Sequence, residues 1–247
     1  MRVSLFVPCL VDRFLPEIGL ACAKVLEEVG CSVELDRRQT CCGQPPFNAG
    51  FPAEATHLAR RMLSVFKDAG VVVAPSGSCV AMVRDAFGDL DLTETEFAAW
   101  KRLRERTFEL SEFLVANGLH VRLRPRFKAR VAVHRTCHHL RHAGGEGPLS
   151  EVLARVDGME PVESAEAREC CGFGGVFSMK LPELSVAMGK RRLDGMLALG
   201  PDVIALADAG CILHLRGIAS AAGIDVPVVH YAQLLSDTVL PAGGRRG

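Results

Sequence analysis

Eight of the ten cysteines in this chain form a pattern that occurs twice. Each copy has one cysteine, a Cys-Cys-Gly triplet that starts 32 or 33 residues later, and another cysteine 37 or 40 residues after the triplet's second cysteine. The copies are offset by 128 to 132 residues; their cysteines are Cys9, Cys41, Cys42 and Cys79, then Cys137, Cys170, Cys171 and Cys211. Self-similarity at a fixed offset indicates an internal duplication.

Three kinds of chemistry are compatible with one such quartet of thiols. A disulfide between neighbours such as Cys41 and Cys42 closes a strained small ring, and a reducing cytosol disfavours it. Zinc prefers tetrahedral ligands that proteins usually present as spaced cysteine pairs. An iron–sulfur cluster contains several irons, so adjacent thiolates can bind different metal atoms. The spacing favours a cluster, with zinc and metal-free thiols as the alternatives.

Residues beside the quartets add candidates for the same sites. Gly43 and Gly172 complete the triplets, and glycine lets the backbone approach a bulky cluster without a Cβ clash. His214 lies three residues after the last repeat cysteine, which makes it a candidate metal ligand or hydrogen-bond partner of a cluster sulfur or substrate. His138 directly follows Cys137 and is a candidate for the same roles. For both histidines the alternative is a packing or capping role.

Apolar patterning places the repeat cysteines at the ends of strands. Continuous apolar runs typical of strands in a parallel sheet occur at residues 3–7, 71–74, 131–133 and 203–206. Helical periodicity is found at residues 17–29 and 54–68, and a further helical stretch, 183–199, follows the second triplet. Because ligands of open α/β sheets bind beyond the carboxyl ends of the strands, each unit is expected to gather four cysteines at one edge.

We therefore predict an α/β fold of two duplicated Rossmann-like units, each β-α-β-α-β, with parallel sheets related by a pseudo-twofold axis. The predicted parts are a first unit at 1–92, a helical connector at 93–128, a second unit at 129–240 and a flexible tail at 241–247. The connector opens with a capping box at Thr93–Glu96 and continues with an apolar helical stripe to Leu110. Cys22 and Cys31 lie outside the repeat and are predicted to be core residues.

Composition and charge limit the partners and the compartment. The 247 residues are 49% hydrophobic and 23% charged, which is too apolar for disorder. Lys+Arg and Asp+Glu are both 29, so charge gives no support for nucleic acid as the main partner. No apolar run reaches the ~18–20 residues of a membrane span. The N-terminal apolar run is interrupted by Asp12 and Arg13 without a cleavage site, which favours a cytoplasmic protein.

The two patterns of cysteines resemble those of the CCG, or cysteine-rich, domain family. The resemblance spans about residues 1–240, and the blocks that carry it are Val3–Asp12, Cys41–Pro45, Pro75–Cys79 and Cys170–Gly175. The family includes the cysteine-rich component of heterodisulfide reductase and the iron–sulfur subunits of glycolate oxidase and anaerobic glycerol-3-phosphate dehydrogenase. The chain is most similar to its stand-alone two-repeat members, which serve lactate utilization.

The resemblance implies an iron–sulfur oxidoreductase subunit in a complex that oxidises L-lactate to pyruvate and is active only with its partners. The implied partners are a larger ferredoxin-like iron–sulfur subunit and a third small subunit. The eight repeat cysteines would hold one or two clusters, of the 4Fe-4S type. The alternatives are a non-catalytic scaffold stabilised by metal or thiols, and the same redox role with glycolate, glycerol 3-phosphate or a disulfide as substrate.

The chain departs from the family motif at one position in each copy. The full motif ends in Cys-x-x-Cys, and its last cysteine is replaced by Met82 in the first copy and by His214 in the second. In the heterodisulfide reductase member of the family such cysteines hold noncubane four-iron clusters. Four cysteines remain in each unit here, which is enough for an ordinary four-iron cluster.

Overall fold

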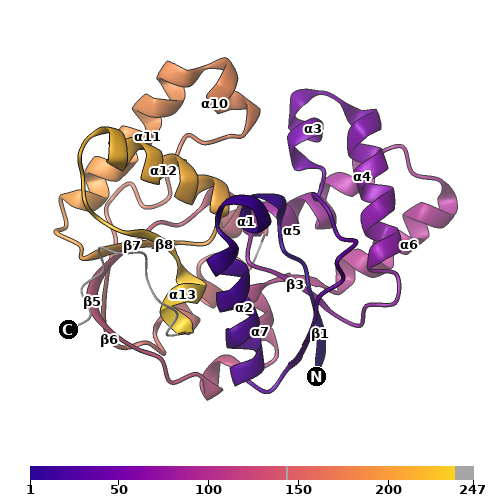
Figure 1. The fold of residues 1–247 in the computed structure, drawn as a ribbon, viewed down its shortest axis with the longest axis horizontal. Helices are drawn as coiled ribbons and strands as arrows, with labels where there is room; N and C mark the ends of the chain where they lie inside the picture. Colours follow the sequence, from indigo (N-terminus) through magenta and orange to yellow (C-terminus); the bar gives the residue numbers. More distant parts are fainter. Residues whose placement is uncertain (143, 237–247) are drawn as a thin grey trace.

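Each half of the chain builds its own sheet in the computed structural model, which describes residues 1–142 and 144–236 (Figure 1). The strand order is β2–β1–β3–β4 in the first sheet and β6–β5–β7–β8 in the second, and every pairing is parallel. The strands are β1 (Arg2–Leu5), β2 (Ser32–Glu34), β3 (Val72–Ala74), β4 (Thr107–Glu109), β5 (Arg126–Val133), β6 (Asp157–Val162), β7 (Val203–Leu206) and β8 (Val228–His230). The predicted fold class is confirmed.

Helices connect the strands in both halves. The first half contains α1 (Cys9–Phe14), α2 (Pro16–Glu28), α3 (Gln44–Ala49), α4 (Pro52–Val65), α5 (Gly77–Arg84), α6 (Glu94–Glu105) and α7 (Leu110–Ala116), with short 3₁₀ turns at Ala86–Asp89 and His120–Arg122. The second half contains α8 (Cys137–His142), α9 (Gly147–Leu153), α10 (Val176–Lys180), α11 (Pro182–Leu197), α12 (Ala209–Ala221) and α13 (Tyr231–Leu235). None of the helices in the described residues is long and apolar enough to cross a membrane.

The central strands are buried on both sides, as continuous apolar runs predict. All three residues of β3 and all four of β7 are buried. Branched Val and Ile side chains fit this setting because they pack well on a pleated surface that is covered on both faces. The first strand of each half, β1 or β5, pairs with a strand on both sides. Its carboxyl end therefore lies between the ends of its two neighbours.

A fourth strand comes from the segment predicted to be a helical connector. Helix α6 begins after Thr93 with the predicted capping box. The helix ends at Glu105, and the Thr107 hydroxyl donates to the Leu103 carbonyl of its last turn (2.7 Å). Strand β4 then pairs with β3, with Thr107 opposite Val72. Strand β4 occupies the place in its sheet that β8 occupies in the other. Each sheet therefore has one strand more than the predicted β-α-β-α-β unit. The boundaries of the units stay predictions, and the tail at 241–247 lies outside the described residues.

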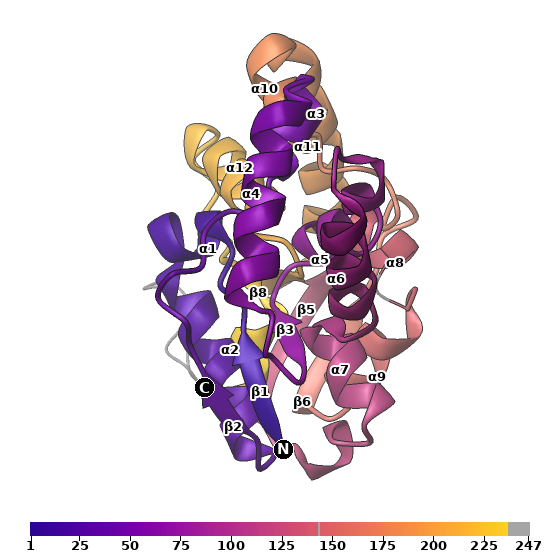
Figure 2. The same ribbon diagram turned by 90° about the vertical axis from the view of Figure 1, so that its right-hand side faces the viewer.

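Helix contacts between the two units occur in equivalent pairs, in which the units are swapped. Helix α7 of the first unit contacts α9 of the second. In the equivalent contact, α13, the counterpart of α7, contacts α2, the counterpart of α9. Likewise α5 contacts α8, and their counterparts α12 and α1 contact each other. Figure 2 shows α7 beside α9 along one side of the molecule. Reciprocal contacts of this kind are expected when two like units meet across a twofold axis.

The units share both an apolar core and buried polar groups. One apolar cluster contains Val3 of β1 together with Val131 of β5. Next to it, the hydroxyl of fully buried Tyr231 donates to Oε1 of fully buried Glu109 at 2.6 Å. A carboxylate in the core requires such donors, because an unpaired buried charge is costly. The second unit thus supplies a partner for a charge in the first.

Asp208 makes a further polar link between the units, directly at the start of α12. Its Oδ1 accepts from the Ser76 hydroxyl (2.9 Å) and from the Ser78 N–H (3.0 Å), and its Oδ2 accepts from the Thr136 hydroxyl (2.7 Å). Burial alone would raise the pKa of Asp208, but the hydrogen bonds from Thr136 and Ser78 outweigh burial and lower the pKa below its usual value. The carboxylate therefore ties the first unit to the second.

Replacing Asp208 with Asn should destabilise the fold by about 2–3 kcal/mol, because hydrogen bonds to a charged group are lost. A group with a lowered folded pKa contributes stability above its unfolded pKa, and that contribution is lost as pH falls through the folded pKa. The difference between wild type and Asp208→Asn should therefore close below about pH 4. Urea unfolding between neutral and acid pH measures it.

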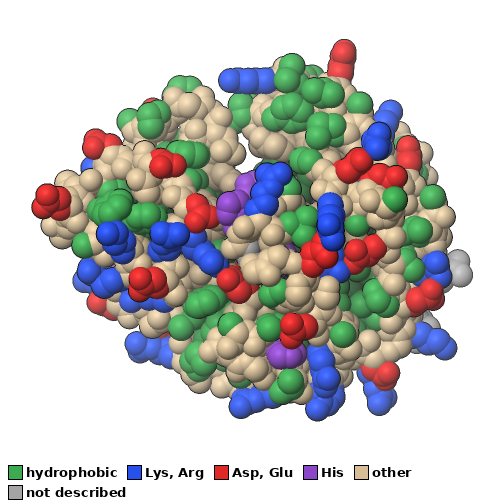
Figure 3. Space-filling model, turned by 180° about the vertical axis from the view of Figure 1, so that it is seen from behind, with side chains coloured by type: hydrophobic (Ala, Val, Ile, Leu, Met, Phe, Trp, Pro, Cys, Tyr) green, Lys and Arg blue, Asp and Glu red, His purple; other side chains and the backbone are tan. Residues whose placement is uncertain are grey.

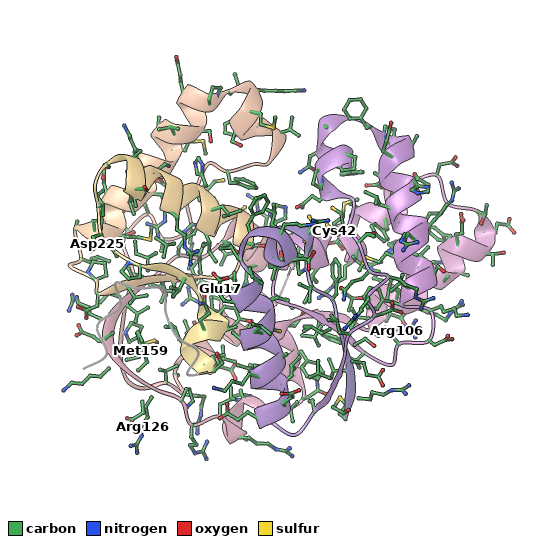
Figure 4. All side chains as sticks on the ribbon, in the orientation of Figure 1. Glu17, Cys42, Arg106, Arg126, Met159 and Asp225 are labelled. Carbon is green, nitrogen blue, oxygen red and sulfur yellow. The ribbon has the colours of Figure 1, made fainter. Side chains whose placement is uncertain are left out.

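The matched control is Asp225→Asn, since Asp225 is exposed on the same unit (Figure 4). It should change stability by no more than about 0.5 kcal/mol. Equal losses for the two variants, or a difference that persists unchanged into acid, would contradict the role given to Asp208.

Candidate metal centres

The first four repeat cysteines converge at the carboxyl end of the first sheet. Cys9 begins α1 after β1, and Cys79 lies in the first turn of α5 after β3. Cys41 and Cys42 end the loop that leads from β2 to Gly43 and α3, and Figure 4 labels Cys42 near the centre of the molecule. The Sγ atoms of Cys9 and Cys41 are 3.5 Å apart, and the Cys42 thiol is hydrogen-bonded to Cys41 and Cys79. Two helices and one loop thus bring these thiols together.

The second four cysteines converge in the same way on the second sheet. Cys137 begins α8 after β5, and Cys211 lies in the first turn of α12 after β7. Cys170 and Cys171 end the loop that follows β6. The Sγ atoms of Cys171 and Cys211 are 2.7 Å apart, and Cys170 is hydrogen-bonded to Cys137 and Cys171. All ten cysteines of the chain are free thiols.

One cysteine of each quartet is stabilised as a thiolate. Hydrogen bonds from Cys42 and Cys9, and from the Gly43 N–H at 3.4 Å, lower the pKa of Cys41 to about 3. Cys170 is the equivalent thiolate of the second quartet, where the same kinds of hydrogen bonds lower its pKa to about 2. Thiolate is the form that binds metals, so each quartet is built around one ready sulfur ligand.

The thiols that donate to these thiolates hold their protons more strongly than free cysteine. Hydrogen bonding to the neighbouring sulfur, and then burial, raise the pKa values of Cys9, Cys42, Cys137 and Cys171. A bound metal cation favours the deprotonated form of these thiols, because it stabilises the thiolates and releases their protons. The clustered sulfurs therefore suit a metal or an iron–sulfur group.

The glycine after each cysteine pair is required by the backbone. Gly43 has φ +90° and Gly172 has φ +87°, which is the left-handed region. A Cβ at Gly172 would lie 2.5 Å from the carbonyl oxygen of Ser185 on α11, and one at Gly43 would lie 3.3 Å from that of Ala55 on α4. The turn and its packing against the following helix thus require glycine, and the expected room for a cluster stays a prediction.

The two residues that replace the last motif cysteine both have structural contacts. Met82 is 2% exposed and lies in the apolar cluster that also contains Cys42 and Cys79. The His214 Nε2 lies 3.2 Å from the Ser185 carbonyl oxygen, which only accepts, so the ring donates there. The role of His214 at a metal stays a prediction, and this hydrogen bond is a competing use of the same nitrogen.

Two other histidines lie near cysteine sulfurs of the second quartet. The Nδ1 of His138 is 3.7 Å from the Cys137 Sγ. One ring nitrogen of His134 and the Sγ atoms of Cys171 and Cys211 lie within 4.8 Å of one another, which is close enough to share a metal ion. Burial, and then the charge of a neighbouring arginine, lower the pKa of His134 to about 3. Sequence analysis did not select His134, although its position directly after a buried strand is a usable signal.

The first quartet is reached from solvent through a cavity of about 420 Å³. Its lining includes Cys9, Cys41, Arg13 and Arg37. From behind, the surface is also hollowed between two lobes, one carrying α3 and α4 and the other α10 and α11, with histidine surface at its base (Figure 3). The cavity is formed by α1 and the loop that leads to Cys41, and the hollow on the back lies between the helices that follow the two Cys-Cys-Gly triplets.

A family model of the cysteine-rich domain matches residues 3–84 and again residues 131–216. Each match contains one quartet, and the matches are offset as the cysteines are. The chain belongs to the cysteine-rich domain family. Three relatives, each called lactate utilization protein A, come from Exiguobacterium sp., Geobacillus kaustophilus and Bacillus subtilis. They are 38%, 37% and 35% identical over 98%, 96% and 96% of this chain, and the matches cover 99% of each relative.

A solved structure shows the same fold for the pair of cysteine-rich domains. The crystal structure of a hypothetical protein from Helicobacter pylori superposes with a TM-score of 0.67 at 11% identity. The match covers 96% of this chain and 49% of that protein, so the chain spans about half of its length. At this identity the likeness concerns the fold alone.

Gly172→Ala should destabilise the chain more than Gly200→Ala. Both glycines have positive φ, but a Cβ at Gly200 meets nothing within 4 Å. Gly200→Ala should therefore cost only the backbone term of about 1–2 kcal/mol. Gly172→Ala adds the clash with Ser185, which should cost about 1–3 kcal/mol more. Denaturant midpoints compare them, and equal losses would show that packing against α11 is unimportant.

Proposed function

We propose that this chain is the iron–sulfur redox subunit of a complex that oxidises L-lactate to pyruvate. The observation that carries the proposal is the pair of all-cysteine quartets, one at the carboxyl end of each sheet. Relatives that match the chain almost end to end are named for lactate utilization. The quartets support the redox role, and the relatives support the substrate.

The donor sets fit four-iron clusters. The residues that would hold the two clusters are Cys9, Cys41, Cys42 and Cys79 in the first unit, and Cys137, Cys170, Cys171 and Cys211 in the second. Each set offers four sulfurs, the usual number for such a cluster. In each set two cysteines are adjacent, which suits a group with several metal atoms better than a single zinc ion. We therefore propose one 4Fe-4S cluster in each unit.

Two clusters match the chemistry of the reaction. Conversion of L-lactate to pyruvate breaks the C–H and O–H bonds at the carbinol carbon and releases two electrons and two protons. Because a four-iron cluster exchanges electrons singly, one in each unit lets the chain carry both electrons. The proposed partners are a larger ferredoxin-like iron–sulfur subunit and a third small subunit, in the cytoplasm. Arg13 and Arg37 in the cavity beside the first quartet suit an approaching carboxylate.

Iron analysis of the full chain, purified without oxygen, tests the cluster assignment. Wild type should contain about eight irons and about eight acid-labile sulfides per chain, and Cys41→Ser about four of each, because one cluster is lost. Cys22→Ala is the matched control, since Cys22 is a fully buried thiol outside both quartets. It should keep the wild-type content. Zinc, or no metal after reconstitution with iron and sulfide, would support the scaffold alternative instead.

Growth of the host tests the substrate. A strain whose only copy carries Cys41→Ser should fail on L-lactate as sole carbon source and grow normally on glucose, whereas the Cys22→Ala strain should grow on both. Normal growth of Cys41→Ser on lactate, with a defect on glycolate or glycerol 3-phosphate, would show that the redox role serves another substrate.

A further inference from the structure

His134 is a fully buried polar side chain that the proposed function does not use. It lies one residue beyond β5 and three before Cys137, and its ring is 0% exposed. One of its ring nitrogens is within 4.8 Å of the Sγ atoms of Cys171 and Cys211. A polar ring placed there needs a partner for each nitrogen, or burial costs free energy.

One partner is on α11. The Nε–H of Arg192 donates to the Nδ1 of His134 at 3.0 Å. A guanidinium always carries its Nε proton, so Nδ1 is the acceptor and holds no proton. A neutral ring with a bare Nδ1 carries its proton on Nε2. That Nε2–H is buried and makes no hydrogen bond of good geometry among the described residues, and its one weak interaction is with the backbone carbonyl of Ala167.

We propose that the Nε2–H of His134 donates a hydrogen bond to a sulfur of the iron–sulfur group in the second quartet, and that Arg192 is the positioning residue that fixes the ring for it. The inference rests on the proposed function. It also excludes His134 as a metal ligand while Arg192 is in place, because a protonated Nε2 has no lone pair for iron or zinc.

The positive charge of Arg192 suits a negatively charged iron–sulfur group in the second quartet. Arg192 is 0% exposed and forms no ion pair among the described residues, although the charges of Glu166, Glu169 and Glu163 act on it from a greater distance. Its Nη1 donates to the Ser164 hydroxyl at 2.6 Å, which is a neutral partner. A buried cation without a paired anion is costly. The thiolates of the second quartet, with the charge of a bound cluster, supply negative charge close to it.

The equivalent positions of the first unit are occupied by apolar side chains. Phe6 corresponds to His134, since it is one residue beyond β1 and three before the first cysteine of its quartet. Met62 on α4 corresponds to Arg192 on α11. Each lies seven residues after the residue whose carbonyl oxygen packs against the triplet glycine, which is Ala55 in the first unit and Ser185 in the second. Phe6 and Met62 are buried in the apolar cluster that contains two cysteines of the first quartet. The pair Phe6 and Met62 is thus replaced by the polar pair His134 and Arg192.

This difference is expected to affect the reduction potential of the second cluster. Reduction adds negative charge to a cluster, and hydrogen bonds to its sulfurs stabilise that charge and raise its reduction potential. The second quartet has the buried donor and its buried arginine, and the equivalent positions of the first unit have apolar side chains. His134 and Arg192 should therefore raise the reduction potential of the second cluster.

Redox titrations of the full chain under anaerobic conditions, followed by EPR, test the inference. In His134→Phe, which copies the first unit, iron and sulfide should stay at the wild-type level and one of the two reduction potentials should move to more negative values. Arg192→Met should move the same potential in the same direction. His134→Gln keeps an N–H donor and should restore most of the shift. His57→Phe changes an exposed histidine and should leave both potentials unchanged.

Full iron with unchanged potentials in His134→Phe would overturn the inference and leave the proposed function standing. Loss of about half the iron in His134→Phe, with the chain still folded, would make His134 a ligand and also overturn it. A wild-type chain that holds no iron or sulfide would overturn the proposed function, and the inference with it.

A measurement on the unmutated chain covers the case in which the variants do not fold. With ¹⁵N-labelled histidine, pulsed EPR of the reduced second centre should detect a weakly coupled nitrogen, as expected for N–H to sulfur contact. A strongly coupled nitrogen, as for direct binding to iron, or no nitrogen at all, would contradict the proposed hydrogen bond.

Discussion

The arrangement depends on one buried carboxylate between the two units. Asp208 accepts hydrogen bonds from residues at the start of α5 and just before α8, and it precedes α12 itself. These three helices carry Cys79, Cys137 and Cys211. A single interaction thus fixes cysteine-bearing helices of both quartets relative to each other. Because Asp208 is 4% exposed and charged, separating the units would remove its two donors from the first unit, Ser76 and Ser78, so the pairing of units and the geometry of the sites are coupled.

Duplication explains the similarity of the two sites, and divergence explains their difference. Parallel strands place the residues that follow them at one edge, so two copies of one unit yield two sulfur quartets in the same setting. The surroundings have changed independently of the sulfurs. Phe6 and Met62 place apolar side chains beside the first quartet, whereas His134 and Arg192 give the second a buried donor and a buried cation. The same four cysteines thus lie in unlike surroundings, which would give two bound clusters different reduction potentials.

The sequence predicted much of this fold, because its strongest signals are physical requirements of the fold. Buried runs predicted the central strands, and repeated cysteines predicted two units with thiols at strand ends. Strand β4 was not predicted, since Thr107–Glu109 lies within an apolar stripe of helical spacing and becomes a strand only by pairing with β3. His134 was not selected either, because the contact that gives it a role comes from Arg192, 58 residues away in the chain. Long-range partners of this kind leave no local pattern.

The central claim is that both quartets bind iron–sulfur clusters. Native mass spectrometry of the wild-type chain, prepared and sprayed without oxygen, tests it most directly, because the added mass identifies iron, sulfide and zinc in intact single molecules. The account requires a main species that carries two four-iron clusters, and a single-cluster species after loss of one. A chain that carries zinc in both sites, or that stays free of metal after reconstitution, would contradict it.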